Sequence, residues 1–94
     1  MVYGRLEMKS LTGDTFENEY SIRGKLITII NSMGDKVSCL TNIKGEYEFS
    51  NLRKGRYTIL FPFLDKYEYV TPSLYLCNLN EGENLEINSI IVKK

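Results

Sequence analysis

The densest cluster of ionisable side chains in this sequence is acidic and lies between residues 14 and 19. It contains Asp14, Glu17 and Glu19, with Asn18 among them. Calcium takes about six to eight hard oxygen ligands, several of them carboxylates, but residues 8–11 just before the cluster, MKSL, add almost none. The preferred interpretation is a solvated loop, because acidic residues in loops usually face water. At most a weak calcium site is expected, and no other cofactor.

Residue types that carry catalysis are scarce. The chain has no histidine, so it lacks the commonest general base and the commonest zinc ligand. A glycosidase needs a pair of carboxylates, but the chain also lacks tryptophan and offers little stacking surface for a sugar. No glycine-rich motif runs from a strand into a helix to hold a phosphate. We therefore predict that the chain is not an enzyme.

Two cysteines, Cys39 and Cys77, are the only thiols. They are too far apart in sequence for a redox pair of the C-x-x-C type. Three interpretations stay open. Both thiols can be buried as small hydrophobic groups, they can form one internal disulfide in an oxidising compartment, or one or both can cross-link neighbouring copies. Burial is preferred to internal bonding.

Three tyrosines, Tyr67, Tyr69 and Tyr75, come close together in the last third of the chain. Tyrosine buries much area at small entropic cost while its hydroxyl stays hydrogen-bonded, which suits an interaction face. The same residues can also cover the ends of a core. The sequence does not separate the two interpretations.

Length and charge limit the classes of protein that remain. Ninety-four residues suit a single domain over residues 1–94. Twelve basic and twelve acidic residues cancel, so no basic excess is present to bind nucleic acid. The longest apolar runs, near residues 26–30 and 59–64, are too short to span a bilayer. No signal peptide is expected, since no charged-then-apolar segment opens the chain.

The elements that position these residues are β-strands. Residues 41–61 alternate apolar and polar side chains on both sides of two glycine turns, a pattern typical of half-buried strands in hairpins. A turn at residues 32–35 is expected to need a positive φ at Gly34. The run 22–31 contains a near-continuous apolar stretch, LITII, which predicts a central strand buried on both faces. We expect seven strands, at residues 2–9, 22–31, 36–41, 46–49, 56–61, 67–79 and 85–92. The sixth is interrupted at Thr71-Pro72, which indicates an edge strand, a bulge or two short strands.

Turn signals at intervals of about 8–12 residues are typical of an all-β sandwich. The predicted fold is a seven-stranded antiparallel sandwich of the Ig-like or transthyretin-like kind. Its predicted core consists of Leu6, Leu26, Ile29, Leu40, Tyr47, Phe49, Leu52, Tyr57, Ile59, Leu76, Ile87 and Ile90.

A glycine and aromatic pattern over nearly the whole chain adds a family resemblance. The pattern opens with residues 2–6, VYGRL, and continues with residues 24–29, GKLITI. Its strongest block comprises Gly34, Thr41, Gly45, Tyr47, Phe49, Leu52, Gly55, Tyr57 and Ile59. The chain thus resembles the serine-aspartate-repeat B-like and collagen-adhesin B-type domains of bacterial surface proteins, within the wider clan of transthyretin-like, carboxypeptidase regulatory-like sandwiches.

The resemblance implies certain site residues. In the collagen-adhesin group a lysine on an early strand and an asparagine on the last strand form an isopeptide bond, assisted by a buried acid. Lys25 and Asn88 match the lysine and the asparagine, but the expected place of the acid is held by Phe61 or its neighbours Leu60 and Pro62. Without a carboxyl to move the proton, we expect no such bond. The family typically lacks a disulfide and carries an acidic calcium loop after its first strand.

The expected function is a non-enzymatic structural or interaction module of a bacterial surface, appendage or spore-surface fibre, used in adhesion, spacing or self-assembly. Its partners would be copies of itself or neighbouring surface-protein domains, and its location cell-surface or extracellular. The first or the last strand is expected to act as the donor edge. The alternative is a monomeric accessory domain that binds a carbohydrate or a peptide through loops at one end of the sandwich.

Overall fold

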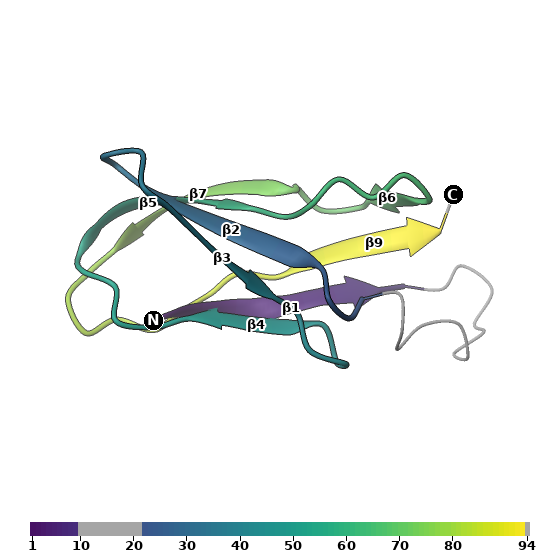
Figure 1. The fold of residues 1–94 in the computed structure, drawn as a ribbon, viewed down its shortest axis with the longest axis horizontal. Coiled ribbons are helices and arrows are strands. Elements are labelled where there is room, and N and C mark those ends of the chain that lie inside the picture. Colours follow the sequence, from purple (N-terminus) through teal and green to yellow (C-terminus); the bar gives the residue numbers. More distant parts are fainter. Residues whose placement is uncertain (10–21, 94) are drawn as a thin grey trace.

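The computed structural model describes residues 1–9 and 22–93. The predicted calcium ligands, Asp14, Glu17 and Glu19, lie outside the described residues, so the calcium site stays a prediction. The described residues form nine strands and no helix (Figure 1). The strands are β1 (Val2–Met8), β2 (Leu26–Asn31), β3 (Lys36–Leu40), β4 (Glu46–Phe49), β5 (Gly55–Leu60), β6 (Tyr67–Tyr69), β7 (Leu74–Leu79), β8 (Leu85–Glu86) and β9 (Ser89–Lys93).

The strands make two sheets that pack face to face (Figure 1). One sheet has the order β4-β1-β9-β6, and β8 pairs with β1 beside that path. The other has the order β3-β2-β5-β7 and is antiparallel throughout. The two-sheet, all-β architecture agrees with the prediction from the turn spacing.

The expected number of seven strands was wrong, as was the expectation that all of them pair antiparallel, whereas the interruption expected at Thr71-Pro72 is confirmed. The run 67–79 divides at Thr71-Pro72 into β6 and β7, which belong to different sheets. The last run divides into β8 and β9, and both pair with β1 in parallel. Proline ends a strand because it has no N–H for the ladder. The parallel pairing joins the first and last strands, a contact that no local pattern in the sequence encodes.

The core lies between the sheets and is built by strict alternation. In β1 and β4 every second side chain is buried and its neighbours point outward. The buried apolar residues are Val2, Leu6, Ile27, Ile29, Tyr47, Phe49, Ile59, Phe61, Leu64, Leu79, Ile87 and Ile91. Six of the predicted core residues are among them, and Leu52 and Tyr57 are partly buried against this core.

Four predicted core residues lie elsewhere. Leu26, Leu40 and Leu76 have exposed fractions of 49%, 64% and 78%. In β9 the residue buried in the core is Ile91, and the predicted Ile90 is only half-buried. The strand β2 is central in its sheet, as predicted, but only one of its faces is buried. The reason is that β2 is apolar at both odd and even positions, so alternation alone could not tell which set faces inward.

Two similar asparagine turns join β2 to β3 and β3 to β4. The side-chain oxygen of Asn31 accepts hydrogen bonds of 2.9 Å from the main-chain N–H groups of Met33 and Asp35. The side-chain oxygen of Asn42 does the same for the residues two and four positions later. Gly34 has φ of +87°, as the sequence predicted for this turn. These local bonds align β3 with β2 without help from the core.

A break in the last strand separates β8 from β9. The carbonyl of Ile87 turns away from the β1 ladder and accepts a buried hydrogen bond of 2.5 Å from the Tyr47 hydroxyl. The side-chain oxygen of Asn88 replaces it and accepts from the N–H of Arg5 at 2.8 Å. Gly4 makes room for this arrangement, since a Cβ there would lie 1.8 Å from the Ile87 oxygen.

Candidate interaction surface

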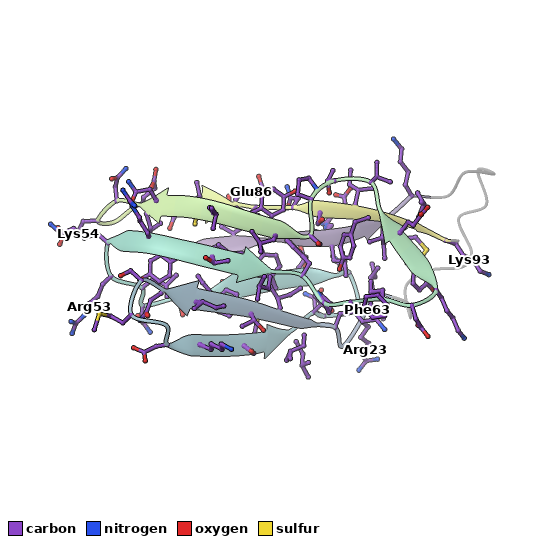
Figure 2. All side chains as sticks on the ribbon, turned by 90° about the horizontal axis from the view of Figure 1, so that it is seen from above. Arg23, Arg53, Lys54, Phe63, Glu86 and Lys93 are labelled. Atoms are coloured by element: carbon purple, nitrogen blue, oxygen red, sulfur yellow. The ribbon has the colours of Figure 1, made fainter. Side chains whose placement is uncertain are left out.

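The sheet β3-β2-β5-β7 presents an aliphatic surface to solvent. Leu26, Leu40, Leu74 and Leu76 are exposed there by 49%, 64%, 49% and 78%, and we call these four residues the leucine face. Figure 2 looks onto this sheet from above. Soluble monomers seldom expose contiguous apolar patches larger than a few hundred Å², so this face is a candidate contact surface.

The register of the strands places the leucine face as two groups on one side of the sheet, Leu26 with Leu40 on β2 and β3, and Leu74 with Leu76 on β7. Leu26 pairs with Leu40 across β2 and β3, and Leu74 pairs with Leu60 across β7 and β5. Between them, Thr28 and Ser38 share a hydroxyl hydrogen bond of 2.9 Å. The centre of the face is therefore aliphatic and hydroxylated, without a charged group.

Among the described strand residues of this outer face, the charged side chains lie toward one end. Lys36 is the first residue of β3 and Arg56 the second residue of β5, near the turn between β2 and β3. An apolar centre with a polar margin is the usual anatomy of a protein–protein interface.

The outer face of the other sheet is acidic. Glu46 and Glu48 of β4 lie there beside Arg5 and Glu7 of β1. Arg5 lies 3.3 Å from a Glu46 carboxylate oxygen and 3.8 Å from one of Glu7. A hydrogen bond from the Asn42 side chain, and then one from Arg5, lower the pKa of Glu46. The two broad faces thus differ in chemistry, and a partner can distinguish them.

The tyrosines predicted as an interaction face are all half-buried and pack against the core. The Tyr69 hydroxyl donates to the carbonyl of Pro62 at 2.5 Å, and the Tyr75 hydroxyl donates to the carbonyl of Asn88 at 2.9 Å. The Tyr75 ring meets the Phe61 ring edge-on at 6.0 Å. A partner-binding role for Tyr67, Tyr69 and Tyr75 stays a prediction.

Cys39 and Cys77 are both half-buried free thiols. They belong to β3 and β7, the two outer strands of one sheet, with β2 and β5 between them. Three strand spacings amount to about 14 Å, which is more than the ~7 Å limit between the Cα atoms of a disulfide. An internal disulfide is therefore incompatible with this fold. Burial raises the pKa of both thiols, which slows their reaction.

The residues that matched an isopeptide triad are not brought together. Lys25 precedes β2 in one sheet, whereas Asn88 stands between β8 and β9 in the other and caps the N–H of Arg5. The early and last strands that do lie side by side pair Leu6 with Ser89, and both are fully buried. Neither can form an amide cross-link.

Phe61, at the expected place of the acid, lies in an aromatic cluster. It is buried, and its ring meets that of Tyr47 edge-on at 5.7 Å. Ser89 instead donates to the carbonyl of Pro72 at 2.7 Å and lies 2.9 Å from the Thr71 hydroxyl. Apolar packing and hydroxyl bonds thus occupy the interior positions where the resemblance pointed to a cross-link.

Other kinds of site find little support in the part of the chain that the structure describes. Residues 1–9 and 22–93 hold no group of three cysteine or acidic side chains placed to bind a metal ion. The same residues contain no helix long and apolar enough to cross a bilayer.

Comparisons with known proteins find relatives in structure alone. No family model matches the chain, and no curated protein matches it. Solved structures do match, among them the TIE protein of Bacillus anthracis, with a TM-score of 0.62 and 24% identity; GBS52, the minor pilin of Streptococcus agalactiae, with 0.65 and 14%; and a streptococcal ancillary pilin, with 0.60 and 16%. What they share with this chain is the fold.

Each match covers 98% of this chain but only 17%, 44% and 32% of the respective solved chains. The chain therefore spans less than half the length of each of these three proteins. At these identities the likeness shows that the sandwich is of a kind found within larger proteins.

The sequence pointed to three tyrosines as an interaction face and to acidic residues as at most a weak calcium site, and it assigned three of the four residues of the leucine face to the core. One signal was present in the sequence. In residues 26–30, LITII, both alternating sets are apolar except for Thr28, and in a two-layer sandwich only one set can face the core.

Proposed function

We propose that this chain is a non-enzymatic structural or interaction module of a bacterial cell-surface or appendage assembly, which works in adhesion, spacing or self-assembly. The leucine face carries the proposal, because an exposed aliphatic patch of this kind marks a contact with another protein. The fold shared with a minor pilin and an ancillary pilin supports a surface location.

Two predicted sites belong to this proposal. A weak calcium site at Asp14, Glu17 and Glu19 predicts a rise in melting temperature only with millimolar calcium, because a ligand stabilises a fold once its concentration exceeds its dissociation constant. A cross-link between copies through Cys39 or Cys77 predicts a band of doubled mass on non-reducing gels, lost on reduction.

Labelling of intact cells tests the surface location. Antibodies against the chain should bind intact cells of the source bacterium, and external protease should remove the signal before a cytoplasmic marker is degraded. Labelling that appears only after permeabilisation would contradict the proposal. Binding of the isolated chain to a glycan or peptide array, unchanged by Leu40→Lys, would favour the monomeric accessory domain instead.

A further inference from the structure

The four strands that end the two sheets differ in how well they are protected against pairing with another chain. An edge strand exposes a row of unpaired N–H and C=O groups. Proteins usually prevent such edges from pairing with another chain by placing charged residues or prolines on them, or by keeping them short. In the described part of the chain the strands that end the two sheets are β3, β4, β6 and β7, and β8, a two-residue strand with Glu86 that pairs with β1 alone, has a free side as well. The strand β3 begins with Lys36, β4 carries two glutamates, and β6 has three residues with Glu68 in the middle.

Strand β7 has none of these devices. Its six residues, LYLCNL, make it the longest of the four described edge strands, and it contains neither a charged residue nor a proline. The first and last strands, expected from the sequence to be the donor edges, are not available: β1 lies between β4 and β9, and β9 between β1 and β6. The exposed edge with the least protection is therefore β7.

The register shows which main-chain groups β7 leaves free. The N–H of Phe61 donates to the carbonyl of Ser73 at 2.8 Å, one step beyond the register pair of Leu60 with Leu74. In an antiparallel ladder hydrogen-bonded and non-bonded pairs alternate. Tyr75 and Cys77 therefore bond to β5, while the N–H and C=O groups of Leu74, Leu76 and Asn78 point away from it.

The residues with free main-chain groups also carry the exposed side chains of β7. Leu74 and Leu76 belong to the leucine face, with exposed fractions of 49% and 78%, while Tyr75 and Cys77 pack against the core. A strand added at this edge would thus gain main-chain hydrogen bonds and cover leucine surface together, which is how β-augmentation obtains affinity and specificity.

We propose that β7 pairs antiparallel with β7 of a second copy of this chain, about a two-fold axis at Leu76. In this register Leu76 stands opposite Leu76 of the second copy, and Leu74 opposite Asn78. The free groups of both copies then make about six main-chain hydrogen bonds. The two four-stranded sheets become one of eight strands, with the two leucine faces side by side.

The charge of β7 fits a second copy as the occupant, and the area of the contact sets its strength. A two-fold contact places each strand against itself, and β7 has no charged side chain to repel its own copy. Pairing of two six-residue strands buries less than the ~500 Å² per partner typical of the smallest stable interfaces. We therefore expect a weak dimer, with a dissociation constant of roughly 10 µM to 1 mM.

A weak contact suits the proposed function, on which this inference rests. Copies held on one surface or in one fibre meet at a high effective concentration, which strengthens each weak contact without a new interaction. The pairing would then act between displayed modules and hardly at all between dilute free ones.

The test combines sedimentation equilibrium with amide hydrogen exchange followed by NMR, on the whole chain from about 10 µM to about 1 mM. We expect the average mass to rise toward that of a dimer. Over the same range the amides of Leu74, Leu76 and Asn78 should become protected, whereas those of Tyr75 and Cys77 should be protected throughout. This alternation is specific to the proposed register.

Two substitutions at one position separate pairing from folding. Leu76→Pro removes an N–H that faces away from β5, a site where an edge strand tolerates proline. Leu76→Lys adds a charged side chain, which disfavours pairing of this edge with another strand. Leu76→Pro should raise the dimer dissociation constant by about tenfold or more, since the symmetric pair loses one main-chain N–H donor from each copy. Leu76→Lys keeps those donors and should raise the dissociation constant because it places two like charges opposite each other. Protection of the Tyr75 amide reports whether each variant is folded.

Ser38→Pro is the matched control, because Ser38 occupies the corresponding outward position of β3 at the opposite edge. It should leave dimerisation unchanged. A chain that stays monomeric to about 1 mM, with the Leu76 amide unprotected, would overturn the proposal and leave this edge to a segment of another protein. Loss of the dimer in Ser38→Pro and not in Leu76→Pro would overturn it too. Neither result alters the cell-labelling test of the surface location.

Discussion

Replacement of Gly4 by alanine tests how the break in the last strand is held. The added Cβ would lie 1.8 Å from the Ile87 carbonyl oxygen, 2.7 Å from its carbon and 2.9 Å from the Asn88 side-chain oxygen. Cβ atoms essentially never come within 3.0 Å of such atoms, so the Ile87 carbonyl must retreat by more than 1 Å. The obstacle is main chain, and no side-chain rotation can relieve it.

The displacement of the Ile87 carbonyl lowers the free energy of unfolding by weakening hydrogen bonds. It stretches the buried 2.5 Å bond from the Tyr47 hydroxyl to the Ile87 carbonyl and the 2.8 Å bond from the Ile87 N–H to the Tyr3 carbonyl. Each net hydrogen bond is worth about 1 kcal/mol, and an unsatisfied buried hydroxyl costs about 1–3 kcal/mol. We expect Gly4→Ala to lower the free energy of unfolding by about 3–5 kcal/mol, against a total of about 5–14 kcal/mol for a domain of this length.

Urea unfolding followed by circular dichroism measures this loss. Gly82→Ala is the control, because Gly82 has φ of +74° but open space around its Cα, and it should lower stability by only about 1 kcal/mol. In a background of Tyr47→Phe, where the hydroxyl bond is already absent, Gly4→Ala should cost less, which a double-mutant cycle detects. A loss below about 1 kcal/mol for Gly4→Ala alone would refute the steric argument.

Three further predictions concern other groups. The buried Thr41 hydroxyl bonds two main-chain groups, so Thr41→Val should lower the free energy of unfolding by about 1–3 kcal/mol and Thr41→Ser by less, as measured in urea. Burial raises the pKa of Tyr69 from 10.0 to about 12, so the folded state keeps a proton that the unfolded chain loses. Stability should be unaffected by this group below pH 10.0 and fall toward pH 12, less steeply in Tyr69→Phe. Because burial raises the pKa of the Cys39 and Cys77 thiols, a thiol reagent should label both more slowly in the native chain than in urea.

Several features of the fold could be predicted from the sequence because their causes are local. The alternation around Tyr47 and Phe49 placed both rings on one face, and the structure buries both. The glycine at position 34 marked a positive φ, and Pro72 marked the interruption of the long sixth run. In each case a few neighbouring residues determine the outcome.

The candidate surface could not be predicted in the same way. Strand β2 offers Leu26 and Ile30 on one face and Ile27 and Ile29 on the other, and both sets are apolar. Which set turns inward depends on how much space the opposite sheet leaves, and that is a property of the whole packed core.

The sequence by itself thus determined the strands, their turns and the scarcity of catalytic residue types, because period and composition act within a few residues. Only the tertiary structure decided that β1 pairs with β8 and β9, and that β7 ends its sheet. Those pairings join residues more than eighty positions apart in the case of Val2 and Leu85. Their register is set by burial of one shared core, so the free edge and the leucine face exist only once that core has formed.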